Sequence, residues 1–248
     1  MEWYEQWFGE EYLLVYEHRN LDEARREVAA IRDVVGLTGG ELLLDLCCGT
    51  GRHDFPLAAL GCRVIGLDYS DHLLKQAMGQ REVSDRYPVY VRADARKQIF
   101  ADDSFDVILN LFTSFGYFND DENRDMLLMM GRILKPDGKF YIDYLNPPVI
   151  LDGLVEKSER ELNGIHISEQ RRFEPETSRL EKDITLSRQG KTQHFHESVH
   201  LYSEDEMVEM LLSAGLSVEN TLGSIDGERY SQSSPRMILH GRKRPTQL

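Results

Sequence analysis

The residues best placed to do chemistry are an acid and two glycines at the end of a short apolar segment. Asp45 lies inside the segment Leu42–Leu46, and Gly49 and Gly51 follow it closely. A short apolar segment between turn-forming residues is typical of a buried parallel strand. Because glycine adopts positive φ and lets the backbone approach a ligand, the spacing predicts a strand that ends in a tight, ligand-binding turn.

Gly-x-Gly after a strand is compatible with two kinds of nucleoside cofactor. In the dinucleotide fold a third glycine lets the following helix pack close to the pyrophosphate. Asp54 occupies that position here, and its carboxylate would repel a pyrophosphate while its Cβ would obstruct the packing. S-adenosylmethionine fits better, because the carboxylate of Asp45 can orient its amino group and tolerate a sulfonium nearby.

On these residues the segment resembles motif I of the class I S-adenosylmethionine-dependent methyltransferases. Their usual pattern is acid-x-Gly-x-Gly-x-Gly, and this chain departs from it with Cys47 at the first glycine. The resemblance implies that S-adenosyl-L-methionine is the cofactor and that Asp45, Cys47, Gly49 and Gly51 bind it.

Two further acids follow later strands. Asp68 ends the expected strand at 63–68, where its carboxylate can accept hydrogen bonds from both ribose hydroxyls, and Tyr69 can pack on the adenine. A helix N-cap is the alternative role for Asp68. The resemblance places Asp94 and the Ala95 backbone at the adenine edge; an ordinary loop carboxylate is the alternative for Asp94.

The segment 110–118 leaves the fourth expected strand with many apolar, aromatic and hydroxyl side chains. Exposing them to solvent would be costly, so the segment predicts a pocket wall. Its order resembles the corresponding loop of small-molecule N-methyltransferases, particularly the bacterial amino-sugar enzymes. It lacks the Asn-Pro-Pro-aromatic signature of enzymes that methylate adenine or glutamine amides. The sequence Asn146-Pro147-Pro148 does occur, but it follows the fifth strand, and we interpret its prolines as ending that strand.

Six polar or aromatic residues are candidates for contact with the substrate. Two of them lie in the N-terminal helices expected within residues 1–38, and their contact depends on those helices folding over the cofactor as a lid. A purely structural amphipathic role is the alternative for these helices. Asn110 is also a candidate cofactor contact. The candidates are Tyr4, Tyr12, His53, Asn110, Ser114 and Tyr117.

Three functions remain open. The first is methyl transfer to a small molecule, with a nitrogen acceptor preferred. The second places tRNA or a protein in the site, and the third is a cofactor-binding partner protein without catalysis. With 43 Asp and Glu against 29 Lys and Arg, the formal charge is −14. A surface of this sign repels a phosphate backbone and argues against nucleic acid as the substrate.

Strand and helix alternate along most of the chain, which predicts an α/β fold: a doubly wound, Rossmann-like, seven-stranded and mostly parallel sheet with helices on both faces. We expect Gly138 to take a positive φ in a turn before the fifth strand. Strands are expected at 41–46, 63–68, 89–92, 105–111, 138–144, 216–222 and 235–241, and helices at 2–18 and 21–35 and from 52, 70, 120 and 203.

Residues 150–202 change to a period-two pattern, which predicts a three-stranded antiparallel insertion at 165–173, 180–187 and 192–202. We expect one methyltransferase domain over 1–248, with this insertion either capping the site or pairing two subunits in a homodimer. His194, His196 and His200 share one face of the last strand by parity, but no metal site is expected there.

Composition suggests a cytoplasmic protein. The N-terminal segment lacks the order of a signal peptide, and no apolar run approaches the roughly 20 residues that span a bilayer. Three cysteines, with no C-x-x-C spacing, support neither a disulfide framework nor a zinc site.

Overall fold

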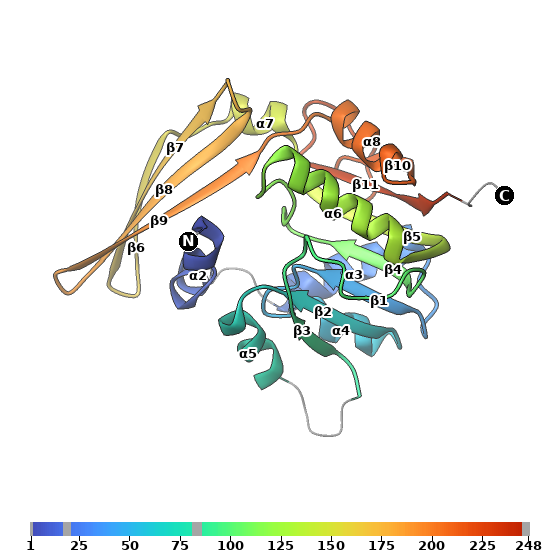
Figure 1. The fold of residues 1–248 in the computed structure, drawn as a ribbon. Coiled ribbons are helices and arrows are strands. Elements are labelled where there is room, and N and C mark those ends of the chain that lie inside the picture. Colours follow the sequence, from blue (N-terminus) through green and yellow to red (C-terminus); the bar gives the residue numbers. More distant parts are fainter. Residues whose placement is uncertain (1, 17–20, 81–85, 245–248) are drawn as a thin grey trace.

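The computed structural model describes residues 2–16, 21–80 and 86–244, which form two β-sheets (Figure 1). The larger sheet has seven strands in the order β10-β11-β5-β4-β1-β2-β3. β11 runs antiparallel to both of its neighbours, and the remaining pairs are parallel. The strands are β1 (Leu42–Leu46), β2 (Arg63–Asp68), β3 (Val89–Arg92), β4 (Phe105–Asn110), β5 (Leu134–Leu145), β10 (Leu216–Leu222) and β11 (Arg236–Lys243). The predicted mostly parallel α/β sheet is confirmed.

Helices cover both faces of this sheet because side chains alternate along each strand. On β1, Leu43 joins the apolar cluster that includes α3 and α4, whereas Leu44 and Leu46 join the cluster that includes α6 and α8. The covering helices are α3 (Leu21–Val35), α4 (Asp54–Ala59), α5 (Asp71–Gly79), α6 (Asp120–Ile133) and α8 (Glu204–Ser213).

Local side-chain bonds fix where the helices start. Ser203 and Glu206 form the capping box expected at α8, and Asn119 and Glu122 form a second one at α6. The turn expected before the fifth strand differs in detail. β5 already begins at Leu134, and Asp137 rather than Gly138 has the positive φ, 60°. Gly138 is needed for space instead, since a Cβ there would lie 2.8 Å from the Leu134 side chain.

The N-terminal segment forms two short helices rather than the single helix expected over 2–18. α1 (Trp3–Trp7) and α2 (Glu10–Val15) are separated at Phe8 and Gly9, and positions 17 and 18 lie outside the described residues. The break lets Trp7 and Val15 share one apolar cluster with isoleucines of the second sheet.

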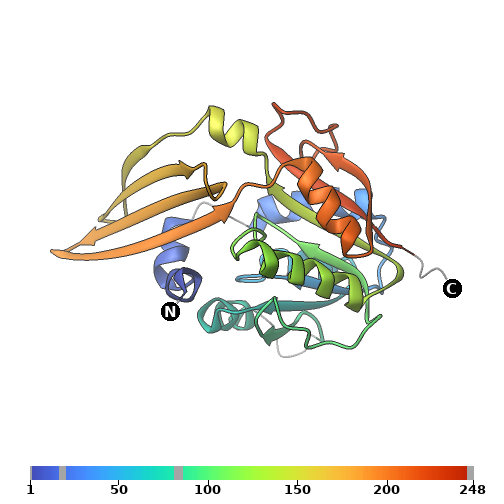
Figure 2. The ribbon, with the colours of Figure 1, turned by 45° about the horizontal axis from the view of Figure 1, so that its top comes forward.

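The second sheet contains the three expected strands and a fourth that the sequence pattern did not reveal. β6 (Lys157–Leu162) is an edge strand of charged, largely exposed residues, so it carries no apolar alternation. Its neighbours are β7 (Ile165–Glu174), β8 (Arg179–Arg188) and β9 (Lys191–His200). Figures 1 and 2 show this sheet projecting from the larger one, with the N-terminal helices beside it.

A short helix, α7 (Pro147–Asp152), leads from β5 towards the second sheet. The buried Asn146 before it donates to the carbonyl oxygens of Ser231, Gln232 and Ser234. Tyr230 in turn donates to the Asn146 side-chain oxygen at 2.8 Å. Asn146 therefore anchors the loop before β11, which supports interpreting Asn-Pro-Pro as structural.

Gly131 offers a test of the α6–α8 packing. A Cβ at this position would overlap the carbonyl oxygen of Ala214 at the end of α8. We expect Gly131→Ala to lower the free energy of unfolding by about 1–3 kcal/mol in denaturant titration. The control Gly79→Ala, at a helix end where nothing lies within 4 Å, should be neutral or slightly stabilising. Equal effects for both variants would contradict this account of the packing.

Candidate active site

A cavity of about 470 Å³ lies at the carboxyl ends of the parallel strands. The chain order reverses between β1 and β4, and this switch point is where doubly wound sheets bind ligands. Strand ends form one side of the cavity, and side chains from α1, α2 and the loop after β4 form the other. Among the lining residues are Tyr4, Phe8, Tyr12, Asp45, Cys47, Gly49, His53, Asp68, Tyr69, Asp94, Ala95, Phe112, Ser114 and Tyr117.

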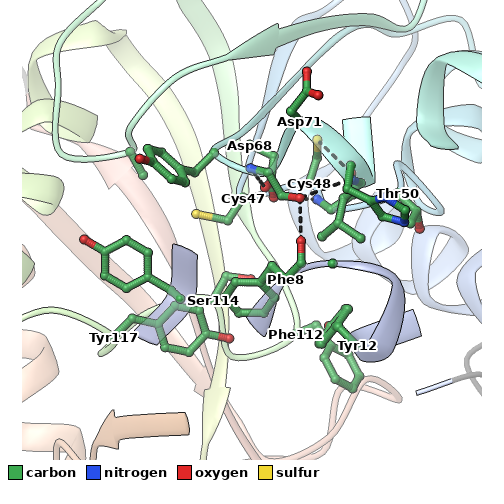
Figure 3. A pocket seen from close by; sticks show the side chains of 18 of the residues that line it. Phe8, Tyr12, Cys47, Cys48, Thr50, Asp68, Asp71, Phe112, Ser114 and Tyr117 are labelled. Carbon is green, nitrogen blue, oxygen red and sulfur yellow. Dashed lines mark hydrogen bonds between the residues drawn. The ribbon is translucent and has the colours of Figure 1, made fainter. Parts of the chain in front are cut away.

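The turn after β1 has the backbone expected of a glycine turn. Gly49 and Gly51 have φ of 57° and 69°, and Cys47 also takes a positive φ, 65°, at the position of the missing glycine. Figure 3 shows the Cys47 sulfur directed into the cavity. Gly51 does not line the cavity; a Cβ there would overlap the Tyr90 hydroxyl below the turn.

Asp45 lines the cavity but is almost fully buried. Among the described residues, neither of its carboxylate oxygens has a hydrogen-bond partner of regular geometry. Burial, together with the adjacent carboxyl group of Asp54, raises its pKa well above the usual range. A buried, unsatisfied acceptor is costly, so the site fits a ligand that brings a cationic donor such as an amino group.

Asp68 holds the turn together. Its carboxylate accepts hydrogen bonds from the backbone amides of Gly49 and Ser70, both at 2.8 Å. Burial raises its pKa, while these amides act in the opposite direction. The N-cap of α5 is Ser70, which accepts from Leu73, so the alternative role of Asp68 as N-cap is excluded. The remaining lone pairs of Asp68 face the cavity, where ribose hydroxyls can donate to them.

Asp94 is fixed by Arg96, a residue that the sequence did not single out. The Arg96 guanidinium donates to both Asp94 oxygens at 2.7–3.2 Å and also pairs with Glu122. Burial alone would raise the pKa of Asp94, but the Arg96 bonds lower it overall, so the group stays ionised. Arg96 also stacks over Phe118, at 4.6 Å from the ring centroid.

Tyr4 and Tyr69 lie near this end of the cavity. Their rings meet edge to face with centroids 6.1 Å apart, and the Tyr69 hydroxyl donates to Glu5 at 2.7 Å. Tyr4 also packs on Phe118, close to Asp94 and Arg96. Tyr4 therefore lies on the side expected to hold the adenine, and its contact with substrate stays a prediction.

The opposite part of the cavity is bordered by four rings, which we call the aromatic wall: Phe8, Tyr12, Phe112 and Tyr117. Phe8 lies 5.0 Å from Tyr12 and 5.7 Å from Tyr117 between centroids. Figure 3 shows the four rings near Ser114, whose hydroxyl donates to a backbone carbonyl. Burial raises the pKa of Tyr117 well above its usual range, so its phenol stays protonated. The sequence did not predict Phe8 as a site residue. Phe8 lies at the break between α1 and α2, and its side chain lines the cavity.

His53 lines the cavity in a cluster with two charged residues. Its Nε2 lies 2.6 Å from Glu27 of α3, and Arg52 pairs with the same carboxylate oxygen at 3.1 Å. Burial works to raise the pKa of Glu27, but its bond to His53 and the charge of Arg52 hold it below the usual range. The Arg52 guanidinium also lies 5.3 Å from the centroid of the Phe112 ring.

The loop that carries Phe112 is strained and braced. Phe112 and Thr113 have φ of 61° and 60°, which L-residues rarely adopt. Asp143 of β5 accepts from both backbone amides, through its side chain for Phe112 and its carbonyl for Thr113. Arg236 of β11 bonds the Asp143 carboxylate at 2.7 Å and the Thr113 hydroxyl at 2.9 Å. The sequence did not predict this contact between Asp143 and Arg236, because the two residues are far apart in the chain and meet only when β5 and β11 pair.

Asn110 lies outside the cavity lining. It is fully buried, and its amide donates to the carbonyl of Leu46 at 2.9 Å, joining the ends of β4 and β1. Its side-chain oxygen has no partner within the described part of the chain. The structure thus gives Asn110 a bracing role, and its contacts with cofactor and substrate stay predictions.

Two features outside the cavity complete the description. In residues 2–16, 21–80 and 86–244 no cluster of His, Cys, Asp and Glu has the arrangement of a metal site. Of the expected histidine row, His196 pairs with Glu181 and Asp183, and His200 pairs with Asp120. No helix in those ranges is long and apolar enough to cross a membrane.

Comparison with known proteins identifies relatives of one kind. Residues 43–138 match the family model described as a methyltransferase domain. The cypemycin N-terminal methyltransferase of a Streptomyces species is 30% identical over 205 residues, which cover 81% of this chain and 82% of that protein. The demethylmenaquinone methyltransferase of Clavibacter sepedonicus is 40% identical over 126 residues, or 50% of this chain and 49% of that protein. This chain therefore spans about half the length of the demethylmenaquinone enzymes that it matches.

The fold also matches solved structures. The sugar N-methyltransferase KedS8 from Streptoalloteichus sp ATCC 53650 superimposes with a TM-score of 0.70 at 24% identity. The match covers 95% of this chain and 94% of that one, so it extends beyond the main sheet into the second sheet.

Replacing Asp68 tests the assignment of the ribose site. We expect Asp68→Ala to weaken binding of S-adenosylhomocysteine by about 1–3 kcal/mol in calorimetry, because polar groups of ligand and turn lose their acceptor. Asp125→Ala, which removes an exposed carboxylate of α6, is the matched control and should leave affinity unchanged. Thermal unfolding of both variants separates lost binding from lost folding. Unchanged affinity in Asp68→Ala would show that the ribose assignment is wrong.

Proposed function

This chain belongs to the S-adenosylmethionine-dependent methyltransferases, and on that premise we propose that it methylates a nitrogen atom of a small-molecule acceptor. The observation that supports this most directly is the aromatic wall. It borders the cavity away from the Asp68 strand end, which would give cofactor and acceptor separate sides of one cavity. When bound, S-adenosylmethionine supplies a methyl group activated by a sulfonium.

Asp45 and Asp68 are suited to hold the two ends of the cofactor, its amino group and its ribose. Asp94, kept ionised by Arg96, can accept from the adenine amino group. Cys47, which lies close to Asp68, directs its sulfur into the cavity. Its side chain would therefore contact the cofactor.

A nitrogen acceptor fits the chemistry of the wall. An amine that has lost its proton before binding needs little general-base help, and the wall offers rings and protonated phenols rather than a carboxylate. Methylation leaves a cation on the nitrogen, and aromatic faces attract a cation. The names of two relatives point the same way, since one is an N-terminal methyltransferase and the other a sugar N-methyltransferase.

The N-terminal helices would serve to exclude water and orient the acceptor. They are tied to the turn after β2, where Ser70 donates to the Phe8 carbonyl at 2.6 Å and Tyr69 bonds Glu5. Positioning of reactants in such a closed space can contribute roughly 7–11 kcal/mol to catalysis. We keep the prediction that these helices act as a lid, and also those of a cytoplasmic location and of dimerisation through the second sheet.

A carbon acceptor of the quinone type is the second candidate, because the demethylmenaquinone enzymes share half of this chain. Their match covers half of this chain, whereas that of the sugar N-methyltransferase covers nearly the full length. The net charge of −14 continues to argue against tRNA.

The proposed function is tested by measuring S-adenosylhomocysteine release with a panel of acceptors. The panel holds amino sugars, short peptides with free N-termini, a demethylated naphthoquinone and bulk tRNA. We expect turnover with an amine and loss of turnover when that amine is acetylated. Turnover with the quinone or tRNA, and with no amine, would overturn the proposal.

Tyr12 tests the aromatic wall. With the amine found in that screen, we expect Tyr12→Ala to lower kcat/KM for the acceptor about tenfold, the size of one cation–π contact with the charge that develops on the nitrogen. The cofactor affinity should change less than about twofold, since Tyr12 lies away from the Asp68 strand end. Tyr12→Phe, which keeps the ring, is the control and should behave like the parent. A parallel loss of cofactor affinity in Tyr12→Ala would contradict this division of the cavity.

A further inference from the structure

One buried polar cluster extends from the cavity lining into the protein interior. It consists of Asp45 at the end of β1, Asp54 at the start of α4 and Tyr90 in β3. Asp45 is 1% exposed and Asp54 is 0% exposed. In the described residues none of the four carboxylate oxygens, nor the Tyr90 hydroxyl, has a hydrogen-bond partner of regular geometry. Three unsatisfied polar groups side by side in a protein interior need an explanation.

Two glycines leave the space that this cluster fills. A Cβ on Gly66 of β2 would lie 2.7 Å from an Asp54 oxygen and 2.7 Å from the Tyr90 ring. A Cβ on Gly51 would overlap the Tyr90 hydroxyl. The cluster therefore lies directly beneath the glycine turn, and only Asp45 reaches the cavity lining.

The surroundings of the two carboxyl groups disfavour two negative charges. Burial raises the pKa of Asp54 to about 7, against the opposing effect of hydrogen bonding with Asp45 and Tyr90. Burial and the charge of Asp54 raise the pKa of Asp45 well above its usual range. Other groups face the pair from each neighbouring element: Asp68 on β2 adds negative charge, the thiol of Cys48 in the turn and the Tyr90 phenol stay neutral, and His53 opposes the rise. At least one proton therefore remains on the pair near neutral pH.

We propose that Asp45 and Asp54 share one proton in the free protein and release it when the amino group of the cofactor binds at Asp45. The proposal rests on the proposed function, which places that amino group there. One carboxyl O–H bond breaks, its proton passes to solvent, and the pair gains the negative charge that faces the incoming ammonium. Asp54 is thus a positioning residue: it acts through Asp45 and does not itself line the cavity.

Proton release gives cofactor binding a definite pH dependence. The complex holds fewer protons than the free protein, so affinity rises with pH until the pair is ionised without ligand. With the Asp54 pKa near 7, most of the change should fall between pH 6 and pH 8. A carboxylate already ionised in the free protein would give no such change.

Calorimetry with S-adenosylhomocysteine tests the proposal. Titrations at pH 6 in buffers of different ionisation enthalpy should show release of about one proton, and affinity should be about tenfold weaker at pH 6 than at pH 8. In Asp54→Asn the amide keeps the shape and donates to Asp45, so Asp45 stays ionised. That variant should bind at pH 8 within about threefold of the parent and lose most of the proton release and pH dependence.

The amino group of the ligand titrates equally with both proteins, so the difference between them isolates Asp54. Failure of the parent protein to bind S-adenosylhomocysteine at any pH would overturn the proposed function. Binding by the parent without proton release, or an unchanged pH dependence in Asp54→Asn, would overturn the shared proton alone. If Asp54→Asn does not fold, the number of protons that the parent protein releases on binding S-adenosylhomocysteine still tests the shared proton.

Discussion

The site depends on a carboxylate that the protein buries without satisfying. In the described chain the Asp45 oxygens lack regular hydrogen-bond partners, and such a group costs roughly 1–3 kcal/mol or more when left unpaired. β1 lies between the parallel strands β2 and β4 in the middle of the sheet, so Asp45 is in the protein interior. A ligand that brings a cation relieves this cost. On the proposed function, binding of the cofactor amino group would recover stability that the fold loses at Asp45.

The opposite side of the cavity is also held away from relaxed geometry. Phe112 and Thr113 take left-handed backbone conformations that cost of order 1–3 kcal/mol each, and Asp143 and Arg236 bond both residues in place. Arg236 belongs to β11, the antiparallel strand, so the closing strands of the sheet help to determine where the Phe112 ring lies in the cavity. The two guanidinium groups near Phe112, from Arg52 and Arg236, restrict that ring further.

The sequence predicted what depends on local pattern. Parallel strands and helix N-caps depend on residues that are close in the sequence. The strand predicted at 89–92 therefore has the same bounds as β3, and Ser203 was correctly predicted as a helix cap. Features that depend on tertiary contact were missed. The edge strand β6 has no apolar alternation, and the salt bridge of Arg96 with Asp94 needs the folded loop. The exchange of roles between Asp137 and Gly138 depends on the geometry of the folded turn. The Leu134 side chain and the Lys135 carbonyl oxygen both lie 2.8 Å from where a Gly138 Cβ would be, and a residue pattern does not give such distances.

The second sheet helps to determine the position of the aromatic wall. Glu197 of β9 accepts from the Trp7 indole and the Tyr16 hydroxyl, and Lys182 of β8 bonds both Glu197 and Tyr16. These bonds fix α1 and α2, which carry Phe8 and Tyr12 into the aromatic wall. A change in the second sheet would therefore move the wall without touching the acids that face it. Acceptor choice can then vary among related enzymes while the cofactor side stays constant, because the two sides are held by different sheets.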